Sequence, residues 1–162
     1  MSTLIFILIL SALLRFWNLP DLITFTLDEE IEAFIVKNII TGYHFPSIGI
    51  SVAPVGIHLS PLFYYLAVIS FWLGNLNPVA WGVTASTIGA ITTLILYLVT
   101  EEMFSKRVAI FSTLLYSSSF LMVLYDKHFW NVMPVPLIAV ISIYSLYKII
   151  IGKLWWSLPL AF

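Results

Sequence analysis

Three short polar clusters in an otherwise apolar sequence contain the side chains that could do chemistry. The first places four acids within residues 28–32, the second joins a histidine to two tyrosines within residues 58–65, and the third gathers acidic, basic and amide groups within residues 126–131. A carboxylate can act as a general base, and imidazole, ammonium and hydroxyl groups donate hydrogen bonds to phosphate oxygens. These residue types therefore predict proton abstraction together with the binding of a phosphate or a sugar.

The acid cluster stands at the start of a predicted helix. Its members are Asp28, Glu29, Glu30 and Glu32. Thr26 and Glu29 have the spacing of a capping box, and Gly42 is a stop signal. Capping and solubility are an alternative interpretation, because acids in a first turn also interact favourably with the helix dipole. A helix needs only one or two acids for that purpose, so the density of the cluster favours a general base at the membrane surface.

The second cluster surrounds the start of another predicted helix. Ser60 is the predicted N-cap, Pro61 the first helical residue and Gly74 the stop signal. His58 and Tyr64 carry donors of the kind that the phosphate of a lipid headgroup needs, so we predict that they bind one. The alternative is a plain helix start within the aromatic belt of a membrane interface.

The third cluster lies between two apolar blocks. Asp126, Lys127 and His128 follow one another, and Asn131 comes three residues later. A connecting loop anchored by Trp130 is the alternative interpretation. Such a loop needs no acid at the membrane edge, so the cluster predicts a phosphate or sugar site.

The composition is typical of a protein that is embedded in a lipid bilayer. Of 162 residues, 61% are hydrophobic and only 9% charged, and the mean hydropathy of +1.05 excludes a soluble globular domain. The net charge of −1 argues against nucleic acid as a partner, and the absence of cysteine excludes a thiolate zinc site and a thiol nucleophile. The apolar residues run in unbroken blocks, which predict an all-α, polytopic helical membrane protein in a lipid bilayer.

The apolar blocks define a predicted topology for a single transmembrane domain. Membrane spans are expected at residues 3–19, 79–100, 108–125 and 133–151, and another begins at 155–162. A cleaved signal peptide is the alternative for the first block. Residues 20–59 form a long external loop, and the helix at 61–73 would be only about 20 Å long, too short to cross, so it is expected to lie along the interface.

The positive charges test this topology. If the helix at 61–73 stays at the interface, Lys106, Arg107, Lys148 and Lys153 share one side of the membrane. If the helix crosses, six of the seven cations lie opposite Lys127. The count alone leaves both arrangements open. Helix length favours the interfacial arrangement, which also places the first and third polar clusters on the same side.

The helix that follows the acid cluster is predicted to be amphipathic and to lie on the membrane surface. Its apolar side would hold Ile31, Phe34, Ile35 and Ile39. Its opposite side would hold Glu29, Ala33 and Lys37. A helix with such faces can lie in the interface with its apolar side in the lipid.

The order of these motifs resembles the GT-C glycosyltransferases of the protein mannosyltransferase and aminoarabinose transferase type, which are family 39-like. A first span ending at Arg15, LDEE at 27–30, HLSPLFYYL at 58–66 and Trp130-Asn131 carry the resemblance. It implies that Asp28 is the catalytic base, with Glu29 beside it. It also implies that the segment after His58 lies near the donor phosphate.

The resemblance implies an inverting enzyme with a membrane-bound donor. The expected reaction moves a sugar from a polyprenyl-phosphate carrier to a protein, lipid or glycan acceptor, at the non-cytoplasmic face of the plasma (inner) membrane. His58, Lys127 and Arg15 are the cations expected to stabilise the leaving phosphate. Members of the family are much longer, so the chain is expected to be an N-terminal part that is inactive alone.

Two alternatives stay open at this stage. The chain could be a non-enzymatic membrane protein that binds lipid or a partner, as a scaffold or a transporter subunit. The charge-free long spans argue against an ion pathway. The histidines have no metal-ligand spacing, so no cofactor is certain, and a divalent metal is left open.

Overall fold

The computed structural model describes residues 2–23, 25–52 and 56–160, and confirms the predicted all-α class. In chain order the helices are α1 (Ser2–Phe16), α2 (Leu19–Leu22), α3 (Leu27–Ile40), α4 (Leu62–Leu73), α5 (Pro78–Met103), α6 (Lys106–Ser118), α7 (Phe120–Tyr125), α8 (Val135–Ile150) and the 3₁₀ helix η2 (Leu154–Leu160). Between α3 and α4, two-residue strands β1 (Ser51–Val52) and β2 (Ile57–His58) pair antiparallel.

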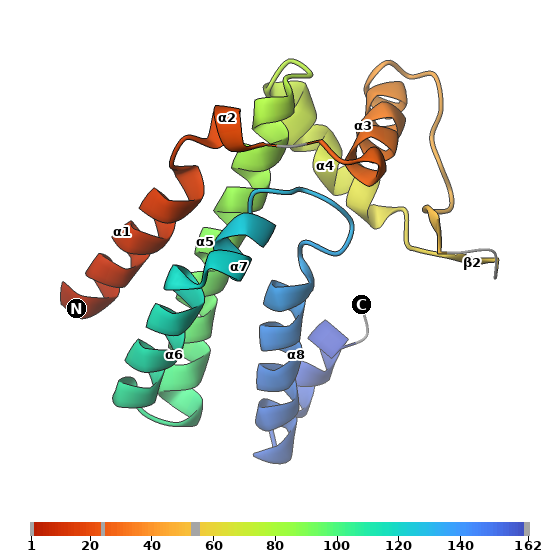
Figure 1. The fold of residues 1–162 in the computed structure, drawn as a ribbon. Helices are drawn as coiled ribbons and strands as arrows, with labels where there is room; N and C mark the ends of the chain where they lie inside the picture. The colour runs from red at the N-terminus through yellow and green to blue at the C-terminus, as the bar shows by residue number, and fades with distance from the viewer. Residues whose placement is uncertain (1, 24, 53–55, 161–162) are drawn as a thin grey trace.

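Helix α5 is the centre of the structure. It packs against α1, α6, α8 and α4, and Figure 1 shows it running through the whole height of the molecule. Small residues at helical spacing line its buried side: Gly82, Ala85, Ser86 and Gly89. Small side chains let neighbouring backbones approach closely, so this stripe explains why several helices pack around one.

One described helix is long and apolar enough to cross a membrane, and it is α5. Three shorter apolar helices accompany it, at Thr3–Phe16, Leu62–Leu73 and Val135–Ile150. The helix expected at 61–73 is therefore present with nearly the expected bounds. Ser60 accepts a hydrogen bond from the Leu62 N–H at 3.3 Å, as an N-terminal cap does.

Two predicted spans differ from the structure. The block at 108–125 is not one helix, because α6 ends at Ser118 and Ser119, with extended backbone, begins α7. The start of a further span, expected at 155–162, forms a 3₁₀ helix over the described residues up to 160. Gly152, with φ of +87°, turns the chain after α8, so that η2 packs back against α8. Residues 161–162 of that prediction lie outside the described part.

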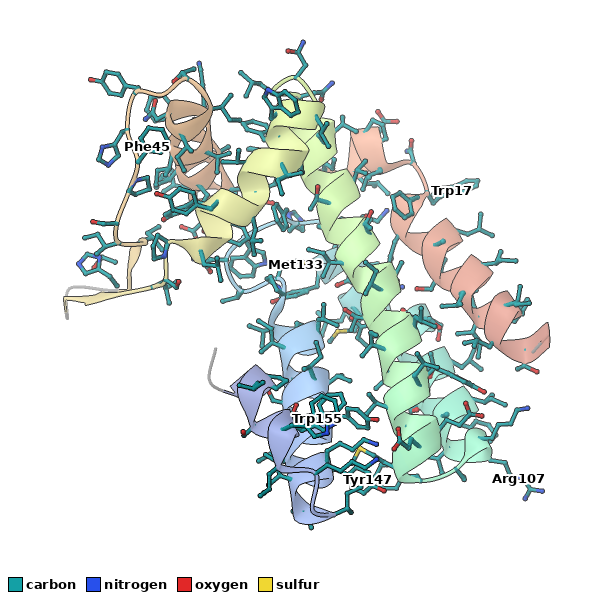
Figure 2. The ribbon with its side chains drawn as sticks, turned by 180° about the vertical axis from the view of Figure 1, so that it is seen from behind. Trp17, Phe45, Arg107, Met133, Tyr147 and Trp155 are labelled. Atoms are coloured by element: carbon teal, nitrogen blue, oxygen red, sulfur yellow. The ribbon has the colours of Figure 1, made fainter. Side chains whose placement is uncertain are left out.

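The helices place α3 and α4 at one end of the molecule, and the connection between α7 and α8 runs beneath them, toward the middle (Figure 1). The turn between α5 and α6 lies at the opposite end, and Arg107 marks that end in Figure 2. Lys148 donates to Glu102 there, which joins α8 to α5.

The faces of α3 differ from the predicted ones. Glu29, Ala33 and Ile39 are buried together toward α4, whereas Ile31 and Phe34 are 41% and 63% exposed. Ile39 therefore shares a face with residues that were expected opposite it. The reason is that α4 supplies a large apolar neighbour, and packing against it decides which side of α3 is buried.

Candidate functional site

The first turn of α3 holds the predicted capping box. The backbone N–H of Thr26 donates to Glu29 Oε2 at 2.9 Å, and the Thr26 hydroxyl donates to the same oxygen at 3.1 Å. This geometry confirms the predicted helix start and fixes the Glu29 carboxylate, which is 1% exposed. Asp28, one residue earlier, is exposed. The two neighbouring acids thus have different environments, one fixed and one open to solvent.

The connection between α7 and α8 lies beside this turn because apolar side chains anchor it. Phe129 packs against the rings of Trp81 and Phe63, with centroid distances of 5.1 and 4.9 Å. Met133 is buried in the same core, and Figure 2 shows it in the middle of the molecule beside α5. Residues 128, 130 and 131 are consequently held near α3 while Phe129 points into the core.

His128, in the connection between α7 and α8, contacts Glu29 of α3. Its Nδ1 atom lies 3.3 Å from Glu29 Oε2, so an N–H at Nδ1 can donate to the carboxylate. The imidazole is partly exposed and the carboxylate is buried. Because 99 residues separate the two in the sequence, this contact joins the first polar cluster to the third.

A cavity of about 180 Å³ opens at this contact. Thr26, Glu29, Tyr125, His128 and Trp130 line it. Its wall therefore combines a carboxylate, an imidazole and two aromatic rings. Such a wall can bind a polar ligand that also has an apolar face, as a sugar ring has.

Glu32 lies one turn further along the buried side of α3. Burial raises the pKa of its carboxyl from 4.5 to about 8; the Asn131 N–H and side-chain amide act against that shift, and the nearby acids Asp28 and Glu29 add to it. Burial also raises the pKa of Tyr64, and the charge of Glu32 adds to that effect. Glu32 is therefore largely protonated at neutral pH.

Arg15, in the last turn of α1, and Asp126, at the end of α7, form an ion pair that is separate from this site. Arg15 Nε donates to Asp126 Oδ2 at 2.7 Å, and both side chains are essentially inaccessible to solvent. Ser11 accepts a second hydrogen bond from the guanidinium at 2.8 Å, and the Tyr116 ring lies against it with its centroid 5.3 Å away. Gly89 makes room for the pair, since a Cβ there would overlap the Asp126 carboxylate.

Lys127 and His58 have structural partners of their own. Lys127 Nζ donates to the carbonyl of Trp17 at 2.9 Å, at the end of α1, where a cation suits the helix dipole. His58 Nδ1 lies 3.1 Å from the Gly49 carbonyl and its side chain does not line the cavity. The Tyr64 side chain is buried in the core between α3 and α4.

The structure thus separates the predicted site residues, and Lys127, His58 and Tyr64 lie apart from the cavity wall. Asp28, Glu29, His128 and Asn131 come together around the start of α3, while Arg15 and Asp126 satisfy each other elsewhere. In the sequence, Glu32 belongs to the acid cluster without a predicted role of its own, Trp130 is predicted as an anchor, and Tyr125 is not singled out. The spacing from Glu29 to Glu32 was a usable signal, because residues three apart share a helix face.

No group of three or more His, Asp and Glu side chains within the described residues is arranged to hold a metal ion. Comparison with protein-family models, with curated proteins and with solved structures finds no match for this chain.

Proposed function

We propose that the chain is the donor-binding and catalytic part of a membrane glycosyltransferase that uses a polyprenyl-phosphate-linked sugar. One observation carries the proposal. An exposed acid, Asp28, stands next to a fixed carboxylate, Glu29, at the edge of a cavity that also offers an imidazole and two aromatic rings. These are the groups that deprotonate a hydroxyl, bind a phosphate and contact a sugar ring.

Asp28 is the proposed general base because it is accessible to an acceptor. It takes the proton of the acceptor hydroxyl, and the oxygen attacks the anomeric carbon from the face opposite the carrier. A new C–O bond forms with inversion as the bond between the anomeric carbon and the phosphate oxygen breaks. The carrier phosphate leaves with the electrons of that bond, and the proton stays on Asp28 until solvent removes it.

His128 is the proposed donor to the leaving phosphate. It is the one basic side chain among the five that line the cavity, and its bond to Glu29 fixes the orientation of the ring. A fixed donor aimed at developing charge costs little reorganisation during the reaction. Trp130, on the same wall, is the proposed surface for the sugar ring.

The carrier's chain is proposed to lie in an apolar groove of about 510 Å³ between α4 and α5. Apolar side chains dominate its lining, which is formed by Leu66, Ile69, Ser70, Leu73, Gly74, Ala80, Val83 and Thr84. In this proposal α1, α5, α6 with α7, and α8 cross the bilayer, α4 lies at its surface, and the site faces the non-cytoplasmic side.

The test is sugar transfer in membranes that contain the full-length protein, with a radiolabelled polyprenyl-phosphate sugar as donor. We expect Asp28→Asn to lower transfer by about 10²- to 10⁴-fold, the usual contribution of a general base. Asp21→Asn is the matched control, because Asp21 is an exposed acid on the neighbouring helix α2. Transfer that survives in Asp28→Asn would overturn the base, and donor binding without transfer would favour a lipid-binding scaffold.

A further inference from the structure

Glu32 is a buried acid that the proposed reaction does not use. Its side chain is 0% exposed, and neither carboxyl oxygen has a hydrogen-bond partner of normal geometry among the described residues. Buried carboxylates in folded proteins are normally paired with a cation or with several donors. Glu32 has no cation among its described neighbours, and the donors near its carboxyl are the N–H and the side-chain amide of Asn131.

The groups that face Glu32 come from three elements. Its own helix contributes Asp28 and Glu29, the connection after α7 contributes Asn131, and α4 contributes Tyr64. Two of these are acids and the other two are neutral. Nothing in this set can balance a negative charge on Glu32, and burying an unbalanced charge is very unfavourable. The uncharged acid is the form that the surroundings can accommodate.

We infer that Glu32 is a positioning residue that acts as an uncharged carboxylic acid and holds Asn131 against α3 without adding charge to the acidic start of that helix. A protonated carboxyl has one donor and one free acceptor, and a side-chain amide offers both complements. Asn131 belongs to the segment that carries His128 and Trp130. Glu32 therefore acts on the cavity through the position of this segment.

The charge on Glu32 also affects the binding of the polyprenyl-phosphate sugar donor. This part of the inference rests on the proposed function. Asp28 and Glu29 already give the start of α3 two negative charges, close to where a phosphate is proposed to bind. A third charge at Glu32 would repel the donor and would loosen the packing of the connection. Above the pH at which Glu32 ionises, donor binding should weaken and transfer should fall.

Infrared spectroscopy of the purified full-length protein in lipid nanodiscs tests the protonation state without any assay of activity. At pH 6 the wild type should show a carbonyl band of a buried protonated carboxylic acid, which disappears as the pH passes about 8. Glu32→Gln should lack the band, and Glu30→Gln, an exposed acid on the same helix, should retain it. An unchanged spectrum in Glu32→Gln would overturn the inference.

The pH profile of transfer tests the positioning role. The wild type should lose activity on the alkaline side near pH 8, whereas Glu32→Gln should stay active to higher pH because its amide cannot ionise. Glu32→Ala should reduce activity at least about tenfold at every pH, and Glu32→Gln should restore it. An identical alkaline limit in wild type and Glu32→Gln would overturn the positioning role. Absence of transfer in the wild type would instead overturn the proposed function and leave the infrared result standing.

Discussion

The pair of Arg15 with Asp126 and the pair of Glu29 with Glu32 are both buried groups of ionisable residues, but the first joins opposite charges and the second places two acids on one helix face. The first joins an acid to a guanidinium that also donates to Ser11, while Arg15 Nη2 and Asp126 Oδ1 have no hydrogen-bond partner among the described residues. The second places two acids on one helix face, with one imidazole at the edge. The first group is arranged for stability, while the second keeps groups unbalanced, as sites for ligands and catalysis often do.

The largest expected effect comes from breaking the balanced pair. Arg15→Met leaves the Asp126 carboxylate buried without a partner, so we expect a loss of about 3–5 kcal/mol in the free energy of unfolding. Combining Arg15→Met with Asp126→Asn should recover most of that loss, because no uncompensated charge remains. Thermal unfolding in detergent, followed by circular dichroism, measures both.

Arg107→Met provides the control for that experiment. Arg107 is an exposed arginine at the opposite end of the molecule (Figure 2), and its replacement should change stability by no more than about 0.5 kcal/mol. If Arg15→Met behaved like Arg107→Met, the ion pair would not be structural, and Arg15 would return as a candidate for phosphate binding.

The second prediction concerns Gly89, which makes room for the ion pair of Arg15 with Asp126. A methyl group at Gly89 would overlap the Asp126 carboxylate and lie 2.8 Å from Arg15 Nε, so Gly89→Ala should cost about 1–3 kcal/mol through overpacking. Thr87→Ala, an exposed position two residues earlier on α5, is the control. Equal Tm values for the two variants would show that α5 and α1 can separate to admit the methyl group.

In the pair of Glu29 with Glu32, replacing Glu32 should raise the free energy of unfolding, which is the opposite of the effect expected at Arg15. The pKa of Glu32 is raised on folding from 4.5 to about 8, so the folded state binds more protons than the unfolded state between these values. The free energy of unfolding therefore falls as pH rises through that window, and stays level above it. Glu32→Gln removes this loss and should stabilise the protein by about 1–3 kcal/mol at pH 8.

Thermal unfolding at pH 5, 6.5, 8 and 9 measures this dependence. The Tm of Glu32→Gln relative to the wild type should increase from pH 5 to 8 and change little between pH 8 and 9. Glu30→Gln should follow the wild type throughout. A difference that shrinks as pH rises would mean that Glu32 is stabilised as an anion and would remove the contrast between the two groups.

Local signals in the sequence predicted local structure well. The spacing of Thr26 and Glu29 predicted a capping box that the structure contains, and Gly42, with φ of +72°, follows α3 as a stop signal should. The pairing of Arg15 with Asp126 could not be predicted in this way, because 111 residues separate them and their partnership depends on how three helices pack. Proximity in the third polar cluster suggested one site, yet Asp126 and His128 face different neighbours.

The buried and exposed faces of α3 were predicted only in part. Hydropathy alone placed Glu29 on a polar, outward side of α3, but Glu29 is buried, as Glu32 is, and contacts His128 of the connection between α7 and α8. The usual rule that polar residues face water and apolar residues face the core does not predict the faces of a helix that buries acids and exposes apolar residues. Leu27, Ile31 and Phe34 are exposed and line a shallow hollow together with Glu30 and Ile35. An exposed apolar patch of this kind marks a surface that can contact lipid or a partner.

The smallest effect on stability, and the sharpest test of where α3 lies, comes from that exposed face. If it contacts lipid at the membrane surface, a spin label at Phe34→Cys should be accessible to dissolved oxygen and shielded from a water-soluble nickel reagent. The chain has no cysteine of its own, so a single label can be placed without background. His44→Cys, an exposed position in the segment after α3, is the control and should show less oxygen and more nickel access. Neither change should alter the free energy of unfolding by more than about 0.5 kcal/mol. Equal nickel access at both positions would place α3 in water, and the acidic site would then open away from the bilayer on which its proposed donor depends.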